Sequence, residues 1–346
     1  RFHCKSCSHN WTAQCSIVEK NCHISKFITL KILELLTEKI SMTFIAKQCH
    51  VSLTTVLRVL KSVESQLPQQ LKPRSFPEVL MVDEFRSHAS YEDKMSFICA
   101  DGETGELVDI LPSRKLDKII PYFNRSPLEE REKVKFLVTD MNAAYFQLTK
   151  NVFPTAKLII DRFHIVKHLN TAFNDFRVRE MKRLITNKKK SKANKLKSNW
   201  KLLLKNQTNI SISEFKTWRS FPSPKYHLLT ESMVIDRLLS FSSELKEAYD
   251  IFHLLMYHFR NKDDRSFFEL LKNLPDSLDT QFRDKIENLI SYEEGIRNAL
   301  KYNFSNGKIE AKNTHIKTLK RVSYGFNSFT NMRIRIFLIN SLIKIK

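Results

Sequence analysis

The sequence predicts an α/β protein in which a core of strands and helices is interrupted by a long all-α insertion. Short apolar runs of strand length fall between residues 78 and 160, and helical segments separate the later runs. Residues 166–301 have helical periodicity but no convincing strand. At 346 residues with 42% hydrophobic side chains, the chain is long enough for two or three units with a substantial core.

The charge of the chain indicates a polyanionic partner. Lys and Arg number 58 against 37 Asp and Glu, which gives a formal net charge of +21. An acidic membrane would attract such a chain as a nucleic acid would, but no apolar run reaches the roughly eighteen residues of a membrane span. No secretory signal is recognisable, so we expect a soluble, intracellular protein. The 5 glycines argue against an enzyme built on a glycine-rich phosphate loop.

Six cysteines are spread thinly along the chain, which is typical of a reducing compartment rather than of a disulfide-stabilised secreted domain. Cys4 and Cys7 have the spacing of one half of a four-ligand zinc site. We therefore expect residues 1–23 to be the C-terminal half of a zinc-binding module whose other half precedes Arg1. Other side chains could complete the coordination, although none has a finger-like spacing to this pair: His3, His9, Cys22 and His23.

Residues 24–66 are predicted to form a helix-turn-helix DNA-binding domain. Helical periodicity over residues 24–40 is followed by a short helix containing Ala46, a tight turn at residues 50–52 and a second helix. His50 stands where glycine is usual, and histidine tolerates the left-handed conformation better than most residues do. The alternative is a three-helix domain with a purely structural role. The side chains expected to contact DNA are Thr54, Thr55 and Arg58.

A linker at residues 67–77, which contains three prolines, leads into the first part of the predicted core at residues 78–165. Its element order, βββαβαβα, is the ribonuclease-H-like arrangement, in which the first and fourth strands lie side by side. The expected strands are residues 78–85, 95–100, 106–111, 134–140 and 156–160, and the expected helices are residues 116–123, residues 142–149 and a helix beginning at Phe163.

Two of the predicted strands end near an aspartate. Asp83 and Asp140 would meet if the first and fourth strands are neighbours. Glu84 would point to the opposite face of the sheet, because side chains alternate along a strand, so we expect Asp83 to face Asp140 and keep Glu84 as the alternative. Three other acids near the turn at residues 101–105 are more simply explained as solvated residues: Asp101, Glu103 and Asp109.

The helical insertion at residues 166–301 contains a strongly basic segment. Helices are expected near residues 173–185, 200–204 and 234–259. Residues 177–205 include twelve Lys or Arg and a single acid, Glu180. A solvated surface is the usual explanation of such a run, but in so basic a protein we expect contacts with DNA phosphates. The centre of the run is the triplet Lys188, Lys189 and Lys190.

The last segment, residues 302–346, is predicted to return to the core and to supply a third carboxylate. A turn at residues 305–307 precedes a helix on which Glu310 shares one face with Asn313 and with basic residues; a solvated amphipathic helix is the alternative. Mg²⁺ and Mn²⁺ prefer carboxylate oxygens, and phosphodiester chemistry uses two such ions about 4 Å apart. The sequence therefore predicts a site for two Mg²⁺ or Mn²⁺ ions made by Asp83, Asp140 and Glu310.

Three blocks of residues together resemble a known family. Residues 82–85 (Val-Asp-Glu-Phe), residues 138–141 (Val-Thr-Asp-Met) and the block from Ser305 through Glu310 to the Gly-Phe pair at 325–326 look like the catalytic blocks of the DDE transposases of bacterial insertion sequences, specifically the ISL-three group. The N-terminal cysteine pair and the helix-turn-helix fall where that family has a zinc-binding module and a DNA-binding domain. The resemblance covers essentially the whole chain.

The resemblance implies a DNA transposase that cleaves strands at the ends of its element and transfers the freed 3′-hydroxyl into target DNA. In that role Asp83 would bridge both metal ions, while Asp140 and Glu310 would each bind one. The implied partners are the terminal inverted repeats and target DNA, bound by a homodimer in the bacterial cytoplasm, at the nucleoid. A non-catalytic DNA-binding regulator derived from a transposase and a stand-alone nuclease of the same fold are the alternatives.

Two further sets of residues gain a role from the resemblance. Asp161 and His164 resemble an Asp-x-x-His motif of several transposase groups with helical insertions; the alternative is a strand end followed by a helix cap. The helix that carries Glu310 would position phosphates of the DNA strand entering the site. The residues expected to do so are Asn313, Lys317, Lys320 and Arg321.

Overall fold

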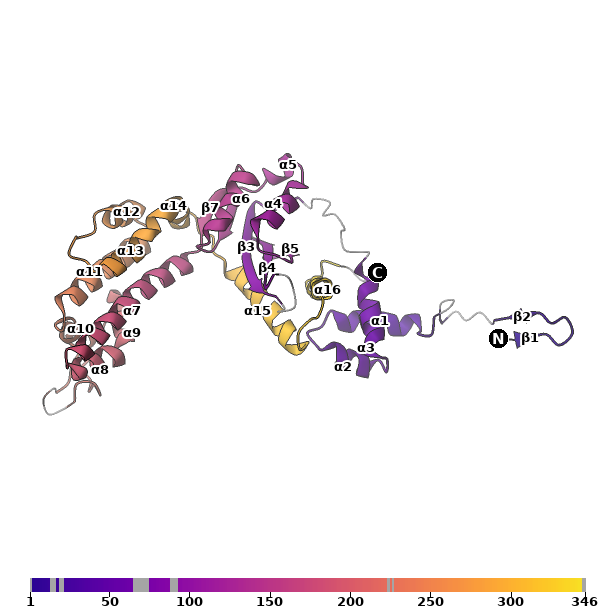
Figure 1. The fold of residues 1–346 in the computed structure, drawn as a ribbon, viewed down its shortest axis with the longest axis horizontal. Helices are drawn as coiled ribbons and strands as arrows, with labels where there is room; N and C mark the ends of the chain where they lie inside the picture. Colours follow the sequence, from indigo (N-terminus) through magenta and orange to yellow (C-terminus); the bar gives the residue numbers. More distant parts are fainter. Residues whose placement is uncertain are drawn as a thin grey trace. The chain divides into compact units, whose positions relative to one another are not determined.

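A computed structural model describes residues 2–12, 17–18, 22–64, 75–87, 93–222, 225 and 227–343, which Figure 1 draws as a ribbon. The chain divides into two compact units. The first unit comprises residues 1–137, 144–156 and 306–346, and the second comprises residues 138–143 and 157–305. Cys15 and residues 67–74 of the predicted linker lie outside the described residues. None of the described helices is both long enough and apolar enough to span a membrane.

A five-stranded sheet with the strand order β5-β4-β3-β6-β7 forms the core, so the predicted α/β class is confirmed. Strands β3 (Val79–Arg86), β4 (Met95–Asp101) and β5 (Leu107–Leu111) form antiparallel pairs. β6 (Phe136–Thr139) begins beside β3, where the Phe136 amide donates to the Glu78 carbonyl at 3.0 Å. β7 (Lys157–Ile160) completes the sheet. The first and fourth strands of the core are therefore neighbours, as the sequence predicts.

Three short helices of the first unit are α4 (Leu116–Asn124), α5 (Leu128–Arg131) and α6 (Phe146–Asn151), of which α4 packs on the sheet through an aromatic side chain. The ring of Phe123 in α4 lies 6.0 Å from the ring of Phe97 in β4 and 5.1 Å from that of Phe153, measured between centroids. All three rings are buried. Burial of this aromatic surface holds α4 on the sheet.

The C-terminal helices α15 (Gly307–Val322) and α16 (Phe329–Ile339) complete the first unit. Arg333 of α16 donates to both carboxylate oxygens of Asp109 in β5, at 2.6 and 2.9 Å, and Tyr122 donates to the same carboxylate. Burial and the Asp109 charge raise the pKa of Tyr122 well above its usual value. Asp109 is fully buried, so its interpretation as a solvated residue is wrong.

Three helices with serine caps form the N-terminal part of the first unit: α1 (Lys26–Leu36), α2 (Met42–Gln48) and α3 (Leu53–Ser62). Ser25, Ser41 and Ser52 each accept a hydrogen bond from an amide in the first turn of their helix. His50, between α2 and α3, has a φ of +54°, the left-handed conformation that glycine adopts more easily.

A buried arginine attaches α16 to this three-helix part. Arg335 is 0% exposed and donates to the carbonyls of Glu38 and Ile40, both at 2.9 Å, in the segment between α1 and α2. Burial lowers the pKa of Arg335 to about 10. Neighbouring residues of α16 therefore hold the helix to β5 on one side and to the three-helix part on the other.

The second unit is built largely from helices. The sequence prediction of one helix over residues 234–259 is wrong, because Ser242 accepts a hydrogen bond from the Leu245 amide at 3.0 Å and so starts a new helix. The helices are α7 (Arg162–Thr186), α8 (Lys190–Ser198), α9 (Trp200–Leu203), α10 (Glu231–Leu239), α11 (Ser243–Arg260), α12 (Asp264–Lys272), α13 (Thr280–Glu287) and α14 (Glu293–Lys301).

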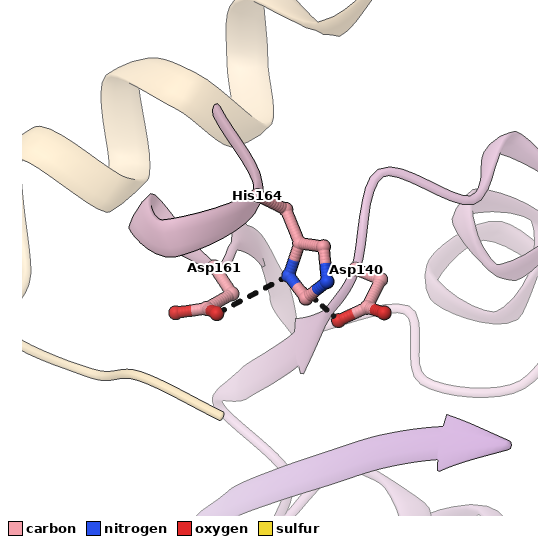
Figure 2. A group of neighbouring side chains, drawn as sticks. All are labelled: Asp140, Asp161 and His164. Carbon is pink, nitrogen blue, oxygen red and sulfur yellow. Dashed lines mark hydrogen bonds and ion pairs between the residues drawn. The ribbon is translucent and has the colours of Figure 1, made fainter. Parts of the chain in front are cut away.

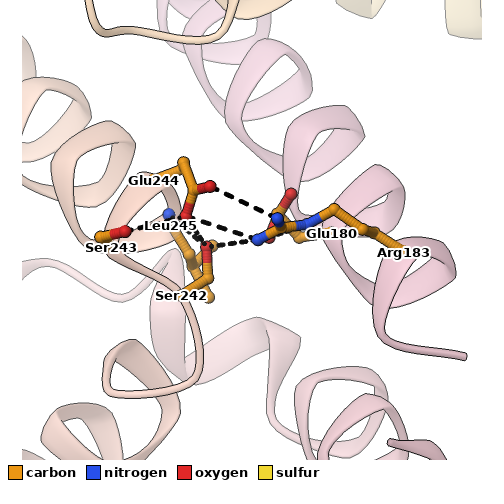
Figure 3. Close-up of polar contacts among 6 residues, drawn as sticks. All are labelled: Glu180, Arg183, Ser242, Ser243, Glu244 and Leu245. Atoms are coloured by element: carbon orange, nitrogen blue, oxygen red, sulfur yellow. Dashed lines mark hydrogen bonds and ion pairs between the residues drawn. The ribbon is translucent and has the colours of Figure 1, made fainter. Parts of the chain in front are cut away.

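A polar network holds α7 to the start of α11 (Figure 3). Arg183 donates to Glu180 at 2.8 Å and to the Ser242 hydroxyl at 3.2 Å, and it lies 3.3 Å from a carboxylate oxygen of Glu244. The backbone amide of Glu244, the hydroxyls of Ser242 and Ser243 and the charge of Arg183 lower the pKa of Glu244 to about 2. One residue of the basic run is therefore used to join two helices.

We predict that Arg333→Met destabilises the chain by about 3 to 5 kcal/mol, because the buried Asp109 carboxylate would lose its cation. Removing both charges in Asp109→Asn/Arg333→Met should cost less, since the amide still accepts from Tyr122. Urea unfolding followed by circular dichroism measures both. Equal losses for the single and the double variant would contradict this account of the ion pair.

We predict that protonation of His253 destabilises the second unit in acid. His253 is buried, with Nε2 at 3.0 Å from the Leu203 carbonyl, and burial lowers its pKa from 6.5 to about 4. Between about pH 6.5 and pH 4, His253 is protonated in the unfolded chain but neutral in the folded chain. The free energy of unfolding therefore falls as the pH drops from 6.5 to 4, by roughly 3 kcal/mol. In thermal melts at pH 7.5 and 4.5, His253→Gln should reduce this loss, whereas His227→Gln, at an exposed position, should not.

Candidate active site

A hydrogen bond joins the first predicted carboxylate to the C-terminal segment. Asn313 of α15 donates through Nδ2 to Oδ2 of Asp83 in β3, at 2.5 Å. The other carboxylate oxygen of Asp83 accepts from the Glu84 amide at 2.7 Å. Asn313 is 6% exposed and Asp83 is half-buried, so the carboxylate is held in one orientation. The first unit therefore brings together two of the predicted site residues.

Glu310 lies one helical turn before Asn313, in the first turn of α15, and is exposed. The positive end of a helix dipole favours a carboxylate at this position. Lys308 fixes the start of the helix, since its Nζ donates to the Gly102 carbonyl at 3.1 Å and also to the Glu103 carbonyl. Glu310 therefore emerges from a fixed helix on the turn next to the residue that binds Asp83.

The neighbouring acid in β3 has a different partner. Arg114 lies 2.8 Å from a carboxylate oxygen of Glu84, so the charge of Glu84 is paired within the first unit. The hydrogen bond also raises the pKa of Arg114. Because alternate residues of a strand face opposite sides of the sheet, the pair directs Glu84 away from the side on which Asp83 meets Asn313. This geometry favours Asp83 over Glu84 as the site residue.

The donors beside Asp83 suit a hard divalent cation. Oδ1 of Asn313 is buried and has no hydrogen-bond partner among the residues that the structure describes. A buried acceptor without a partner costs about 1 to 3 kcal/mol unless water or an ion satisfies it. Carboxylate and amide oxygens are the ligands that Mg²⁺ and Mn²⁺ prefer. The residues around Asp83 therefore fit the predicted ions.

The basic residues of α15 divide into two groups. Lys320 donates through Nζ to the carbonyl of Arg86 at 2.5 Å and to that of Ser87 at 3.4 Å, and burial lowers its pKa. Lys320 thus anchors α15 to the end of β3. Lys317 and Arg321 are exposed to solvent.

A second cluster lies in the second unit, where His164 stands beside two carboxylates (Figure 2). Its Nδ1 is 3.1 Å from Asp140, which follows β6, and 3.3 Å from Asp161, which follows β7. The Asp161 amide donates to the Thr139 carbonyl at 2.9 Å, and this bond sets the two strand ends side by side. Asp161 is 3% exposed. The sequence pairs Asp161 with His164 but does not place Asp140 with them.

The electrostatics of this cluster favour a positive charge. The hydrogen bond to Asp161 raises the pKa of His164, the charges of Asp140 and Asp161 add to this, and partial burial opposes it. One ligand atom from each of the three residues lies within 4.8 Å of the others, close enough to hold a metal ion. Asp161 is the N-cap residue of α7 but makes no side-chain capping bond, so its carboxylate serves His164 rather than the helix end.

The N-terminal cysteines lie in a small hairpin formed by β1 (Phe2–His3) and β2 (Asn10–Trp11). Hydrogen bonds from the backbone and side chain of Cys7 and from the Ser6 amide lower the pKa of Cys4 to about 7. A lowered thiol pKa favours the thiolate that binds zinc. Within the described part of the chain, no third metal-ligating side chain gathers with Cys4 and Cys7.

The predicted DNA-contacting residues of α3 are not equally accessible. Thr54 and Arg58 are exposed. Thr55 is 8% exposed, and its hydroxyl lies 3.0 Å from that of Ser52, so it supports the helix cap. In the second unit, Lys188, Lys189 and Lys190 are exposed where α7 ends and α8 begins.

Comparison with known proteins identifies the family of the chain. A curated protein of Lactococcus lactis subsp. lactis named "ATP-dependent protease" is 40% identical over 113 residues, which are 32% of this chain and 35% of that protein. The transposase for insertion sequence element IS1001 of Bordetella parapertussis is 22% identical over 250 residues, which are 72% of this chain and 57% of that protein. The chain thus spans about a third and somewhat over half of the lengths of these two relatives. A family model described as a transposase matches residues 80–336. This match covers most of the chain, which therefore belongs to the transposase family of the ISL-three group.

Proposed function

We propose that this chain is a DNA transposase that cleaves strands at the ends of its element and joins the freed 3′-hydroxyl to target DNA. Family membership over residues 80–336 carries the proposal, and the pairing of Asp83 with Asn313, one turn from Glu310, supports it. The Bordetella relative is itself named as a transposase. The α/β core would then have the ribonuclease-H-like fold.

Asp83, Asp140 and Glu310 would hold two Mg²⁺ or Mn²⁺ ions. When bound, such ions activate the attacking oxygen and stabilise the leaving oxygen of an in-line displacement. Asn313 holds the Asp83 carboxylate in place. Lys317 and Arg321, which are exposed on α15, would contact phosphates of the DNA strand that enters the site.

His164 and Asp161 are proposed as positioning residues for Asp140. Nδ1 of His164 lies at hydrogen-bond distance from Asp140. The buried Asp161 carboxylate contacts the same nitrogen and would hold the imidazole in place. Partners of a metal-binding carboxylate orient it and tune its affinity, and their loss commonly costs ten- to a hundredfold. The Asp-x-x-His motif would therefore act through Asp140.

The remaining DNA contacts are proposed from the exposed basic and polar residues. The three-helix part would be a helix-turn-helix, with Thr54 and Arg58 of α3 reading DNA. Lys188, Lys189 and Lys190 would contact phosphates.

Cys4 and Cys7 would supply two of four zinc ligands. Pairing two element ends requires two active sites, so a homodimer on DNA is proposed. The match to the Lactococcus protein covers about a third of each chain, so no proteolytic activity is proposed.

We predict that Asp83→Asn, Asp140→Asn and Glu310→Gln each reduce strand cleavage by roughly a thousandfold or more, because each removes a charged metal ligand. Binding of element-end DNA should persist. The measurement is incubation of the full chain with labelled element-end DNA and target DNA in Mg²⁺ or Mn²⁺, with nicked and joined products resolved on gels.

Glu84→Gln is the matched control, because it changes the neighbouring acid of the same strand and leaves Asp83 in place. It should retain cleavage within a few fold. Full activity in any of the three site variants would refute that residue's role. Nicking without joined products would favour a stand-alone nuclease, and DNA binding without nicking would favour a non-catalytic regulator.

For the positioning pair, we predict that His164→Phe raises the Mn²⁺ concentration needed for half-maximal cleavage by about ten- to a hundredfold. His164→Asn, whose amide can still donate to Asp140, should lose less. DNA affinity should be the same for both variants. An unchanged metal dependence in His164→Phe would exclude a role for this residue in positioning Asp140.

A further inference from the structure

A groove of about 1030 Å³ in the second unit lies between α8 and residues 218–220. Ten residues line it; four of them are cationic and none is acidic. The cations are Lys190, Lys195, Lys197 and Arg219. Lys190, Asn194 and Lys197 are spaced four and three residues apart on α8, so they share one face of the helix. Arg219 brings a charge to the opposite wall from a segment distant in sequence.

Fixed contacts hold the two walls of the groove together. Asn199 is 7% exposed, and its Nδ2 donates to the Ser220 hydroxyl at 3.0 Å and to the Lys195 carbonyl at 2.7 Å. The indole of Trp218 donates to the Leu229 carbonyl at 2.9 Å. Phe221 is buried beneath, with Lys195 Nζ at 4.4 Å from the centre of its ring. The groove is therefore built from packed and hydrogen-bonded parts.

The charges of the groove differ from the internal charges of the same basic run. Arg177 is buried and donates to the Leu196 carbonyl, Arg183 pairs with Glu180, and Lys205 pairs with Glu231. Among the residues that the structure describes, no carboxylate lies within ion-pair distance of Lys197 or Arg219. These two side chains are exposed. Their charges are therefore accessible to an anionic ligand.

We infer that this groove binds the sugar–phosphate backbone of DNA without regard to sequence. The inference rests on the proposed function, which makes DNA the partner of the chain. Lysine and arginine neutralise phosphates, while the Asn194 amide can donate to phosphate or sugar oxygens. A groove with four cations and no acid suits a repeated negative charge rather than a base edge. The second unit would thus hold DNA independently of the contacts proposed for α3.

The test compares Lys197→Gln/Arg219→Gln with Lys246→Gln/Arg265→Gln. The control pair removes the same two charges from exposed positions of the second unit outside the groove. Binding of the full chain to a fluorescent duplex of random sequence, without element ends, is measured by anisotropy across KCl concentrations. Each lost phosphate contact lowers the slope of log affinity against log salt by about 0.9, so the groove variant should lose about 2 and bind roughly tenfold more weakly at low salt.

The control variant should bind as the unmodified chain does, and Lys197→Arg/Arg219→Lys should keep the original slope. Circular dichroism confirms that each variant is folded. Equal slopes for the groove and control variants would overturn the inference, as would loss of binding in the charge-preserving variant. Cleavage of element-end DNA is measured separately. Its absence in the unmodified chain, with the slope change still present, would refute the transposase chemistry but leave the groove assignment standing.

Discussion

The hydrogen bond between Asp83 and Asn313 is the constraint on which the candidate site of the first unit depends. It joins a strand and a helix across 230 positions of sequence. Two lysines secure the same helix at its ends: Lys308 donates to a carbonyl of the turn after β4, and Lys320 donates to a carbonyl at the end of β3. With α15 held at three points, helical geometry fixes where Glu310 emerges. A carboxylate presented by a rigid helix needs little reorganisation when it binds a cation.

The second unit positions its acid with side chains rather than with a long helix. Asp161 is buried at the end of β7, and its carboxylate turns to His164 instead of capping α7. His164 in turn lies beside Asp140 (Figure 2). A buried negative charge is stable only when it is paired, and the same ring nitrogen of His164 lies 3.3 Å from the buried Asp161 carboxylate and 3.1 Å from that of Asp140. The two units thus present acids by different means.

Short apolar runs bounded by turn residues predict the strands, because consecutive residues of β3 and β4 are buried on both faces of the sheet and such a run is visible in the local sequence. The approach of Asn313 to Asp83 follows less directly, since helical spacing only places Asn313 on the face of Glu310. The burial of Asp109 has no local signal, because its partner Arg333 lies 224 positions away. The helix break at Ser242 has no signal in the apolar pattern, because the helical periodicity continues across it and the serine acts only by capping the next helix. Accessibility of Thr55 likewise depends on three-dimensional packing.

Basic residues of the chain have two uses, and the difference decides where DNA is expected to bind. Arg183 and Arg333 join helices or strands to one another, whereas Lys197 and Arg219 face a groove without acids.

The proposed chemistry depends on metal binding by Asp83, Asp140 and Glu310. Its most direct test is anomalous X-ray diffraction from crystals of the chain with element-end DNA and Mn²⁺. We expect manganese bound by these three carboxylates. Manganese bound only by Asp140, Asp161 and His164, with Asp83 and Glu310 making no metal contact, would contradict it.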